Sequence, residues 1–327
     1  MTNQWIHKIF TVTPENFEAT ALEVFRFQQA RNPLYARYID LVRGARPVTS
    51  IADIPFLPLN FFKSHAVKTT DFSEQAVFES SGTTGMTSSR HFIKELEIYR
   101  ESFMRCFAAN YGAAEEWCIL GLLPNYLERG QSSLVYMVKE LIDASKHPMS
   151  GFYLSDFERL ASTIAELERR AQKTLLLGVS YALLDFSERF PLPLKNTIVM
   201  ETGGMKGRRR EMLREELHAI LQSRFGVAAI HSEYGMTELL SQAYSAGGGI
   251  FRCPPWMKIL LRDEEDPFEV FGKPGFRKGA INIADLANIY SCAFLATADA
   301  GEFCSDGFRV LGRLDNSDIR GCSLLAV

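Results

Sequence analysis

A run of hydroxyl-bearing residues and glycines is the most specific chemical feature of the sequence, and it follows a short apolar stretch that predicts a strand. Glycines let the backbone turn tightly and approach an anion, and the hydroxyls and N–H groups of such a run can surround phosphate oxygens. The residues of this predicted phosphate loop are Ser80, Ser81, Gly82, Thr83, Thr84 and Gly85. No Gly-Lys-Ser/Thr follows at the spacing of a Walker A loop, so an ordinary Ser/Thr/Gly turn stays an alternative.

A second polar cluster, Tyr234-Gly-Met-Thr-Glu238, comes directly after a predicted strand. Ligands bind at the C-terminal edge of the strands in open α/β sheets. A tyrosine ring can stack on a base, a threonine hydroxyl can bind a phosphate, and a glutamate can hold Mg²⁺. A third segment of this kind, Gly312-Arg-Leu-Asp315, lies close to the end of the sequence.

The elements expected to position these segments alternate between strands and helices from residue 75 onward. Continuous apolar strands between amphipathic helices predict a mixed or parallel sheet that is covered on both faces. We expect strands over 75–78, 117–123, 174–177, 197–200 and 227–231, and helices over 95–110, 132–144, 155–172, 181–190 and 208–225. The sequence thus predicts an α/β fold with a mostly helical segment at 1–70, an α/β core at 71–249 and a smaller β-rich subdomain at 250–327.

The composition excludes several classes of protein. With 36 basic and 39 acidic residues the formal net charge is −3, which argues against a nucleic-acid binder with a broad basic surface. The longest nearly apolar stretch, 175–186, is too short to span a membrane. The N-terminus does not have the pattern of a signal peptide, and the six cysteines form no C-x-x-C pair, so we expect reduced thiols and a cytoplasmic protein.

Taken in order along the chain, the three motifs resemble the signature of AMP-forming, adenylate-forming ligases. Ile54-Pro-Phe-Leu-Pro58, Thr202-Gly-Gly204, His231–Glu238 and Gly312–Cys322 are similar to the LuxE-like acyl-protein synthetases, the fatty-acid-activating component of fatty acid reductase complexes. Phenylacetate–CoA ligases are more distantly similar. The resemblance runs from about Asp53 to the end of the sequence. It implies the large N-terminal domain of these ligases, with their C-terminal rotating domain absent.

The resemblance also implies the reaction and its cofactors. With ATP and Mg²⁺, a carboxylic acid such as a fatty acid would form an acyl-adenylate with release of pyrophosphate, and the acyl group would pass to a thiol. The implied roles are pyrophosphate binding by Ser81, Thr83, Thr84 and the loop glycines, and adenine contact by Gly203, Gly204 and Tyr234, with Gly235 counted among the nucleotide-binding residues. Thr237 would contact the α-phosphate, Glu238 would bind Mg²⁺, Asp299 would bind the ribose, and Arg313 would contact ribose or phosphate.

Two departures from the family pattern leave alternatives open. Thr87-Ser88 stand where the family has Pro-Lys, so the missing cation is expected from Arg90 or His91, unless Arg90 is simply solvated. The family's Arg-Thr-Gly-Asp reads Ala-Thr-Ala-Asp here, so Asp285 competes with Asp299 as the ribose ligand.

The acceptor of the acyl group is also open. Acyl-protein synthetases carry the acyl group on a cysteine near the C-terminus, and Cys322 lies in the matching context. A thiolate can attack a mixed anhydride, and Arg320 can lower the pKa of the thiol. The alternatives are coenzyme A or a cysteine of an acyl-reductase or acyl-carrier partner, with Cys322 then a small buried residue.

Two competing functions are weighed against the ligase. Gly178-Val-Ser-Tyr-Ala182 is close to the nucleophile elbow of α/β hydrolases, with Ser180 as the nucleophile. Only Asp185 lies between Ser180 and the later histidines, His218 and His231, which is a poor match to that fold. The second competitor is a protein that binds a nucleotide or an acyl-adenylate without turnover.

Overall fold

The computed structural model describes residues 2–80, 87–124, 131–205, 209–210, 212–272 and 278–314 of the chain. The chain forms two compact units. Unit 1 combines residues 1–102, 237–241 and 252–327, and unit 2 combines residues 103–236 and 242–251. Unit 1 therefore joins the N-terminal helices to the C-terminal strands. The ranges 1–70, 71–249 and 250–327 stay a prediction about domains.

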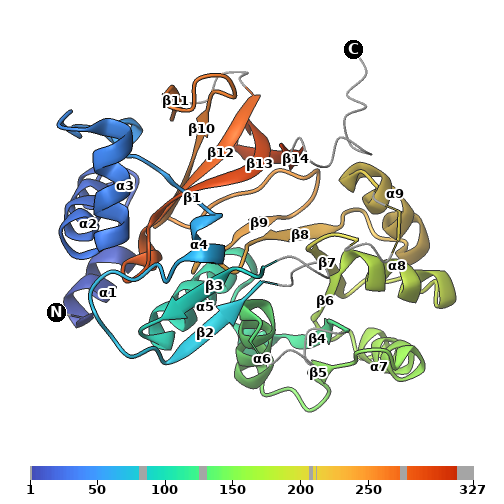
Figure 1. The fold of residues 1–327 in the computed structure, drawn as a ribbon. Coiled ribbons are helices and arrows are strands. Elements are labelled where there is room, and N and C mark those ends of the chain that lie inside the picture. Colours follow the sequence, from blue (N-terminus) through green and yellow to red (C-terminus); the bar gives the residue numbers. More distant parts are fainter. Residues whose placement is uncertain are drawn as a thin grey trace. The chain divides into compact units, whose positions relative to one another are not determined.

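The larger sheet of unit 1 is mixed and mainly antiparallel (Figure 1). Its strands follow the order β1–β13–β12–β10–β11, and β14 also pairs with β13. Strand β1 runs parallel to β13, and the other pairs are antiparallel. The strands are β1 (Leu57–Pro58), β10 (Met257–Arg262), β11 (Val270–Phe271), β12 (Lys278–Asp285), β13 (Phe294–Cys304) and β14 (Gly307–Arg313).

Helices of unit 1 lie beside this sheet, blue beside orange in Figure 1. They are α1 (Thr2–Phe10), α2 (Phe17–Arg31), α3 (Pro33–Arg43) and the short α4 (Phe61–Ser64), with 3-10 turns η1 (Ile51–Asp53) and η4 (Leu286–Asn288). The rings of Phe25 in α2 and Phe294 in β13 lie 6.2 Å apart. Gln28 is buried, and its amide group binds the carbonyl oxygen of Asn288 and the backbone N–H of Ala293, each at 2.9 Å. Apolar packing and a satisfied polar group thus dock α2 on the sheet.

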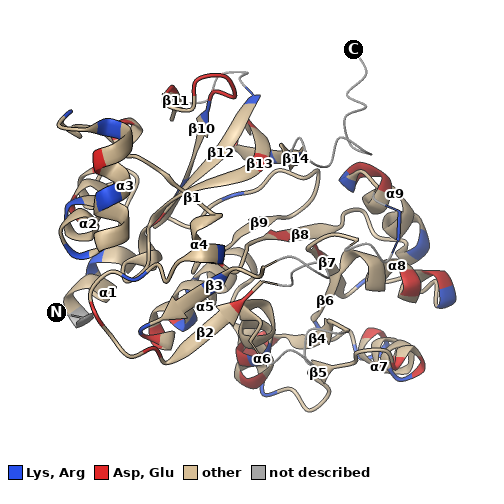
Figure 2. Ribbon diagram, viewed as in Figure 1, with Lys and Arg blue, Asp and Glu red and all other residues tan. Residues whose placement is uncertain are grey.

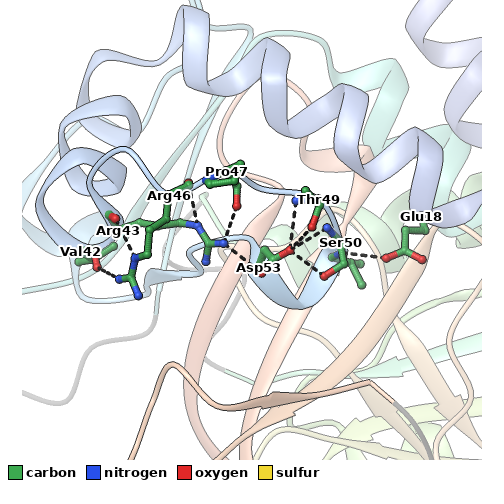
Figure 3. A network of polar contacts seen from close by, with 9 residues as sticks. Glu18, Val42, Arg43, Arg46, Pro47, Thr49, Ser50 and Asp53 are labelled. Atoms are coloured by element: carbon green, nitrogen blue, oxygen red, sulfur yellow. Dashed lines mark hydrogen bonds and ion pairs between the residues drawn. The ribbon is translucent and has the colours of Figure 1, made fainter.

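Asp53 holds the connection between α3 and β1 in place (Figure 3). Its carboxylate accepts hydrogen bonds from the backbone and hydroxyl groups of Thr49 and Ser50 and pairs with Arg43 at 3.0 Å. Burial raises the pKa of Asp53, but these hydrogen bonds outweigh it and hold the pKa well below its usual range. Glu18 of α2 accepts a backbone N–H of η1 at 2.9 Å, so the network ties α2 and α3 to the segment that leads into β1.

Unit 1 also contains an antiparallel hairpin of β2 (Ala76–Glu79) and β3 (Arg90–Ile93). Strand β2 matches the expected strand at 75–78. Strand β3 was not expected, and it lies between the predicted phosphate loop and helix α5 (Leu96–Tyr111). The loop therefore connects two paired strands, which fixes where it starts and ends.

The sheet of unit 2 is parallel except at one edge. Its order is β5–β4–β6–β7–β8–β9, and β9 pairs antiparallel to β8. Every residue of β4 and β6 is buried, as expected for strands covered on both faces. The strands are β4 (Cys118–Leu122), β5 (Gly151–Phe152), β6 (Thr174–Val179), β7 (Thr197–Thr202), β8 (His231–Tyr234) and β9 (Ala243–Ser245).

The helices of unit 2 follow from this strand order. They are α6 (Ser133–Ser145), α7 (Phe157–Arg169), α8 (Ser180–Arg189) and α9 (Arg214–Phe225), after the 3-10 turn η2 (Ala114–Glu116). Helix α6 connects β4 to β5 in one direction across the sheet, whereas α7, α8 and α9 connect β5 to β6, β6 to β7 and β7 to β8 in the opposite direction. Right-handed crossovers therefore place α6 on one face and α7, α8 and α9 on the other. Phe186 of α8 contacts Phe157 of α7 and Phe225 of α9, which agrees with one shared face. The predicted α/β class with covered mixed sheets is confirmed.

Strands β8 and β13 also differ from the expectation. Strand β8 begins at His231, whereas we expected a strand over 227–231, because Gly226 ends α9 in a left-handed conformation and the next residues form a turn. Strand β13, which has 11 residues, was missed. Its alanines and its glycine have low β propensity, and pairing on both sides with β12 and β14 makes it a strand.

Candidate functional site

The base of the predicted phosphate loop is closed by two serines of unit 1. The backbone N–H of Ser80 donates to the carbonyl oxygen of Ser89 at 3.0 Å, and the Ser80 hydroxyl accepts from the N–H of Ser89 at 2.8 Å. Ser80 therefore anchors the base of the loop through both its backbone and its side chain. Ser81, Gly82, Thr83, Thr84 and Gly85 lie outside the described residues.

Glu238 is a buried carboxylate in the same unit, with 7% of its surface exposed. Burial raises its pKa above the usual range, and hydrogen bonding from the Ser89 side chain and the positive charges of Lys63 and Arg313 oppose that rise. Residues of three separate segments thus lower the pKa of one carboxylate: Lys63 of α4, Ser89 at the end of the loop, and Arg313 of β14. Thr237 is half-buried in the turn just before it.

Lys63 is a residue that the sequence analysis did not single out. It is the one basic residue of α4, the blue segment of that helix in Figure 2. The side chain is half-buried, and no ion pair or side-chain hydrogen bond engages it within the described ranges. This half-buried ammonium group lies close enough to Glu238 to oppose the rise in the pKa of that acid, and such a cation can accept a phosphate. Its only sequence signal is a lysine in an apolar, proline-bounded stretch.

His91 and Arg90, the two expected sources of a cation beside the loop, differ in the structure. His91 is 1% exposed, and burial lowers its pKa to about 4, so it is neutral at pH 7. The expectation that His91 supplies a positive charge is therefore wrong. Its Nδ1 lies 2.8 Å from the carbonyl oxygen of Thr237. Arg90 is exposed on β3, with its guanidinium group 5.6 Å from the centre of the Phe92 ring.

The two candidate ribose ligands also differ. Asp285 is fully buried and accepts hydrogen bonds from the backbone N–H of Leu240, the Ser241 hydroxyl and the N–H of Ala287. Burial raises its pKa to about 6, and these bonds oppose the rise. Its oxygens thus hold the 237–241 segment in place, which makes it a structural residue.

Asp299 and Arg313 lie directly opposite each other in the register of β13 and β14. Both belong to unit 1, as does Glu238. Gly312, just before Arg313, has a φ of 139°, a conformation that favours glycine. The predicted ribose-binding and phosphate-binding side chains therefore share one end of a strand pair. Asp315 lies outside the described residues.

In unit 2, the predicted adenine contacts lie at the ends of neighbouring parallel strands. Gly203 follows β7 with a φ of 67°, and its carbonyl oxygen accepts from the Ser180 hydroxyl at 3.0 Å. The space around Gly204 is open. Tyr234 ends β8, is 8% exposed, and its ring centre lies 5.8 Å from that of Phe251.

Beside these residues lies a buried acidic pair that the sequence analysis missed. Glu201 of β7 and Glu233 of β8 are the charged residues at the ends of these strands, drawn red in Figure 2. Arg214 forms an ion pair with Glu201 at 3.1 Å, and Nε2 of His218 lies 3.5 Å from the same carboxylate. Burial raises the pKa of Glu233 to about 7, although the Thr202 hydroxyl donates to it at 2.5 Å. In the sequence, the only indication of this pair was a glutamate within each of two otherwise apolar or uncharged strand segments.

Gly235 is required by this packing. A Cβ atom at Gly235 would collide with the carboxylate of Glu233. The glycine after Tyr234 therefore gives room to a buried acid of the same strand, independently of any contact with a nucleotide.

The contacts of Ser180 do not form a hydrolytic triad. Its hydroxyl donates to the carbonyl oxygen of Gly203 and lies 3.4 Å from Glu201. His218 contacts Glu201 and Ser232, and His231 contacts Tyr111 at 3.1 Å. Neither histidine lies within hydrogen-bond distance of Ser180 in the described structure, so a general base for this serine is missing there.

Burial shapes the chemistry of four described cysteines, whereas Cys304 at the end of β13 is half-buried. Burial raises the pKa of Cys118 to about 11 and those of Cys253 and Cys292 to about 12, so these thiols stay protonated. Cys106 is buried as well. Cys322 lies outside the described residues.

The donor set constrains what metal the protein can hold. No group of three or more His, Cys, Asp or Glu side chains that could bind a metal occurs in the described part of the chain. A closed protein cage for zinc or calcium is therefore absent from that part. Mg²⁺ is commonly held by one or two carboxylates together with substrate phosphates, and a single buried Glu238 fits that pattern. Among the helices that the structure describes, none is long and apolar enough to cross a membrane.

Comparison with known proteins identifies the fold. No protein-family model matches the sequence, and no curated protein matches it. McyG A-PCP complexed with phenylalanyl-adenylate is similar in structure at 14% identity and a TM-score of 0.53, over 83% of this chain and 44% of that chain. The fatty acid AMP ligase from Legionella pneumophila is similar at 13% identity and a TM-score of 0.50, over 76% of this chain and 52% of that chain.

The chain thus spans about half the length of these structures. At such low identity the likeness concerns the backbone arrangement alone. Within that limit it agrees with the mixed, covered sheets described above, and this α/β fold is the fold of the N-terminal domain of adenylate-forming ligases.

Proposed function

We propose that the protein activates a carboxylic acid with ATP and Mg²⁺, forming an acyl-adenylate and pyrophosphate. The observation that carries the proposal is the buried carboxylate of Glu238. Its pKa is affected by the Ser89 side chain at the end of the predicted phosphate loop and by the charges of Lys63 and Arg313. An arrangement of one buried acid and two cations suits a metal-bound polyphosphate, because the metal neutralises the acid and the cations neutralise the phosphates.

In this proposal the chain's own residues orient the phosphates for an in-line displacement. The loop between Ser80 and Ser89 holds the pyrophosphate portion, and Thr237 donates to the α-phosphate. Lys63 supplies the positive charge that Thr87 and Ser88 lack. Bound Mg²⁺ neutralises charge that develops on the phosphate oxygens, and Glu238 is the residue that holds it.

For the nucleoside, the resemblance assigns contact residues in each unit separately. Asp299 accepts hydrogen bonds from the ribose hydroxyls, with Arg313 beside it on β14. We favour Asp299 over Asp285, because the oxygens of Asp285 accept hydrogen bonds from the Leu240 N–H and the Ser241 hydroxyl. Tyr234 stacks on the adenine, and Gly203 and Gly204 allow the base to approach the backbone.

The substrate class and the acceptor extend the proposal. We propose a fatty acid, because the sequence resembles acyl-protein synthetases and one similar structure is a fatty acid AMP ligase. The acyl group then passes to a thiol, with Cys322 as the proposed acceptor. The acyl carbon forms a bond to the thiolate sulfur, its bond to the phosphate oxygen breaks, and AMP leaves.

The test is ATP–pyrophosphate exchange with a panel of carboxylic acids, together with intact mass after incubation with ATP, Mg²⁺ and the preferred acid. Exchange that depends on one class of acid supports adenylation. ATP binding without exchange for any acid would instead favour a protein that binds nucleotides without turnover.

A further inference from the structure

The backbone turn that carries Thr237 and Glu238 is held by side chains from two distant parts of unit 1. Nδ1 of His91 lies 2.8 Å from the carbonyl oxygen of Thr237. Because a carbonyl oxygen can only accept, Nδ1 carries the hydrogen and donates it. Asn288 in η4 donates from Nδ2 to the carbonyl oxygen of Glu238 at 2.7 Å. Two consecutive carbonyl groups of the turn are therefore each fixed by one side chain.

The side chains of His91 and Asn288 are both deeply buried. His91 is 1% exposed and Asn288 is 0% exposed. In the described structure, Nε2 of His91 and Oδ1 of Asn288 form no well-aligned hydrogen bond, although the Asn288 side chain is close enough to oppose the lowering of the His91 pKa. Burying an imidazole and an amide is unfavourable unless they form hydrogen bonds. The bonds to the turn are thus the well-formed polar contacts that compensate for burying these two side chains.

The location of His91 gives the contact a functional meaning. His91 lies on β3, the strand that the predicted phosphate loop leads into, and its ring packs against Phe62, the neighbour of Lys63, at 5.6 Å between ring centres. One histidine thus joins the hairpin under the loop, the helix that carries Lys63, and the turn that carries Glu238. All of these segments belong to unit 1.

We propose that His91 and Asn288 are positioning residues that clamp the Thr237–Glu238 turn, so that the metal-binding carboxylate keeps a fixed place relative to the phosphate loop. This inference rests on the proposed function for its catalytic consequence. The clamp itself is a claim about the structure alone. Misplacing a catalytic group by about 1 Å can lower a reaction rate about 100-fold, so residues that hold Glu238 in place affect the rate without touching the substrate.

The experiment compares four variants with the wild-type chain. His91→Leu and Asn288→Ala each remove one donor to the turn. His91→Asn keeps an N–H donor near the position of Nδ1. Ser291→Ala is the matched control, because Ser291 is buried, lines a small cavity together with His91 and Asn288, and donates to the carbonyl oxygen of Val67 rather than to the turn.

The first readout is amide hydrogen exchange without ligand, in peptides that cover residues 235–242. We expect exchange to rise at least tenfold in His91→Leu and Asn288→Ala, with β12 peptides unchanged, and to stay within twofold of wild type in Ser291→Ala. His91→Asn should recover most of the protection. Equal exchange in His91→Leu and Ser291→Ala, or no recovery with asparagine, would overturn the clamp.

The second readout is pyrophosphate exchange as a function of Mg²⁺. We expect the half-saturating Mg²⁺ concentration to rise at least fivefold in His91→Leu, while KM for the acid stays within twofold. An equal rise in both would mean a general structural defect and would overturn the positioning role. If the wild-type chain shows no exchange with any acid, the proposed function fails, and the amide exchange still decides the clamp.

Discussion

Replacing Lys63 by methionine tests the cation that the phosphate loop lacks. Two unit charges about 4 Å apart interact by about 4 kcal/mol at an effective dielectric constant near 20. Lys63 is half-buried, so water screens part of this, and a hydrogen bond to a charged group contributes about 1.5–3 kcal/mol. Since each 1.36 kcal/mol is tenfold, we expect Lys63→Met to raise KM for ATP about 10- to 150-fold.

The assay is ATP–pyrophosphate exchange with ATP varied at saturating acid and Mg²⁺. Lys63→Arg keeps the charge and should recover at least half of the lost binding free energy. Lys68→Met is the matched control, since Lys68 also lies in unit 1 but pairs with Glu74 at 2.8 Å, and its KM should stay within twofold of wild type. A KM for ATP in Lys63→Met equal to that of the control would refute a phosphate role for Lys63.

Three further outcomes follow from the same contacts. Glu238→Gln should abolish pyrophosphate exchange while the thermal melting temperature falls by less than about 5 °C, because the amide keeps the shape and loses the charge that holds Mg²⁺; normal exchange would rule out Glu238 as the metal ligand. Cys322→Ser should lose a hydroxylamine-sensitive acyl adduct in intact-mass spectra and keep exchange; an unchanged adduct would exclude this thiol as the acceptor. Asp53→Asn should destabilise the protein by about 1–2 kcal/mol at pH 7. Because the folded pKa of Asp53 is depressed, this stabilisation is fully present above the unfolded pKa of about 4 and is lost progressively as the pH falls from there through the much lower folded pKa. The difference in unfolding free energy between wild type and Asp53→Asn should therefore begin to shrink between pH 4 and pH 3, and a constant difference between pH 7 and pH 3 would contradict the assignment.

The parallel sheet of unit 2 could be predicted from the sequence because local pattern and global fold agree there. Strands β4 and β6 are short apolar runs between amphipathic helices, and both are buried throughout. The β13 strand could not be predicted in this way. Its sequence, Phe-Leu-Ala-Thr-Ala-Asp-Ala-Gly-Glu-Phe-Cys, has weak β propensity, and pairing with β12 and β14 decides its structure.

The candidate site shows the same division between local and long-range information. The motif at 234–238 was visible in the sequence, and the structure places Glu238 where several segments act on it. The role of Asp285 was not predictable, because a sequence does not reveal that Leu240 and Ser241 occupy its oxygens. The prediction for His91 was wrong for a related reason. A histidine is positively charged only below its pKa, and burial, which a sequence does not reveal, lowers the pKa of His91.

These errors share a physical cause, which also explains why Lys63 escaped the sequence analysis. A titratable side chain acquires its role from burial and from neighbours, and both depend on residues far away in the chain. Lys63 and Glu238 are separated by 175 positions, yet the lysine lowers the pKa of the buried acid. A lysine that substitutes for a lost loop cation need only reach the same phosphate, so no fixed spacing ties it to the loop. Such a replacement would leave no motif, and the proposal for Lys63 depends on its electrostatic effect on Glu238 in the folded chain.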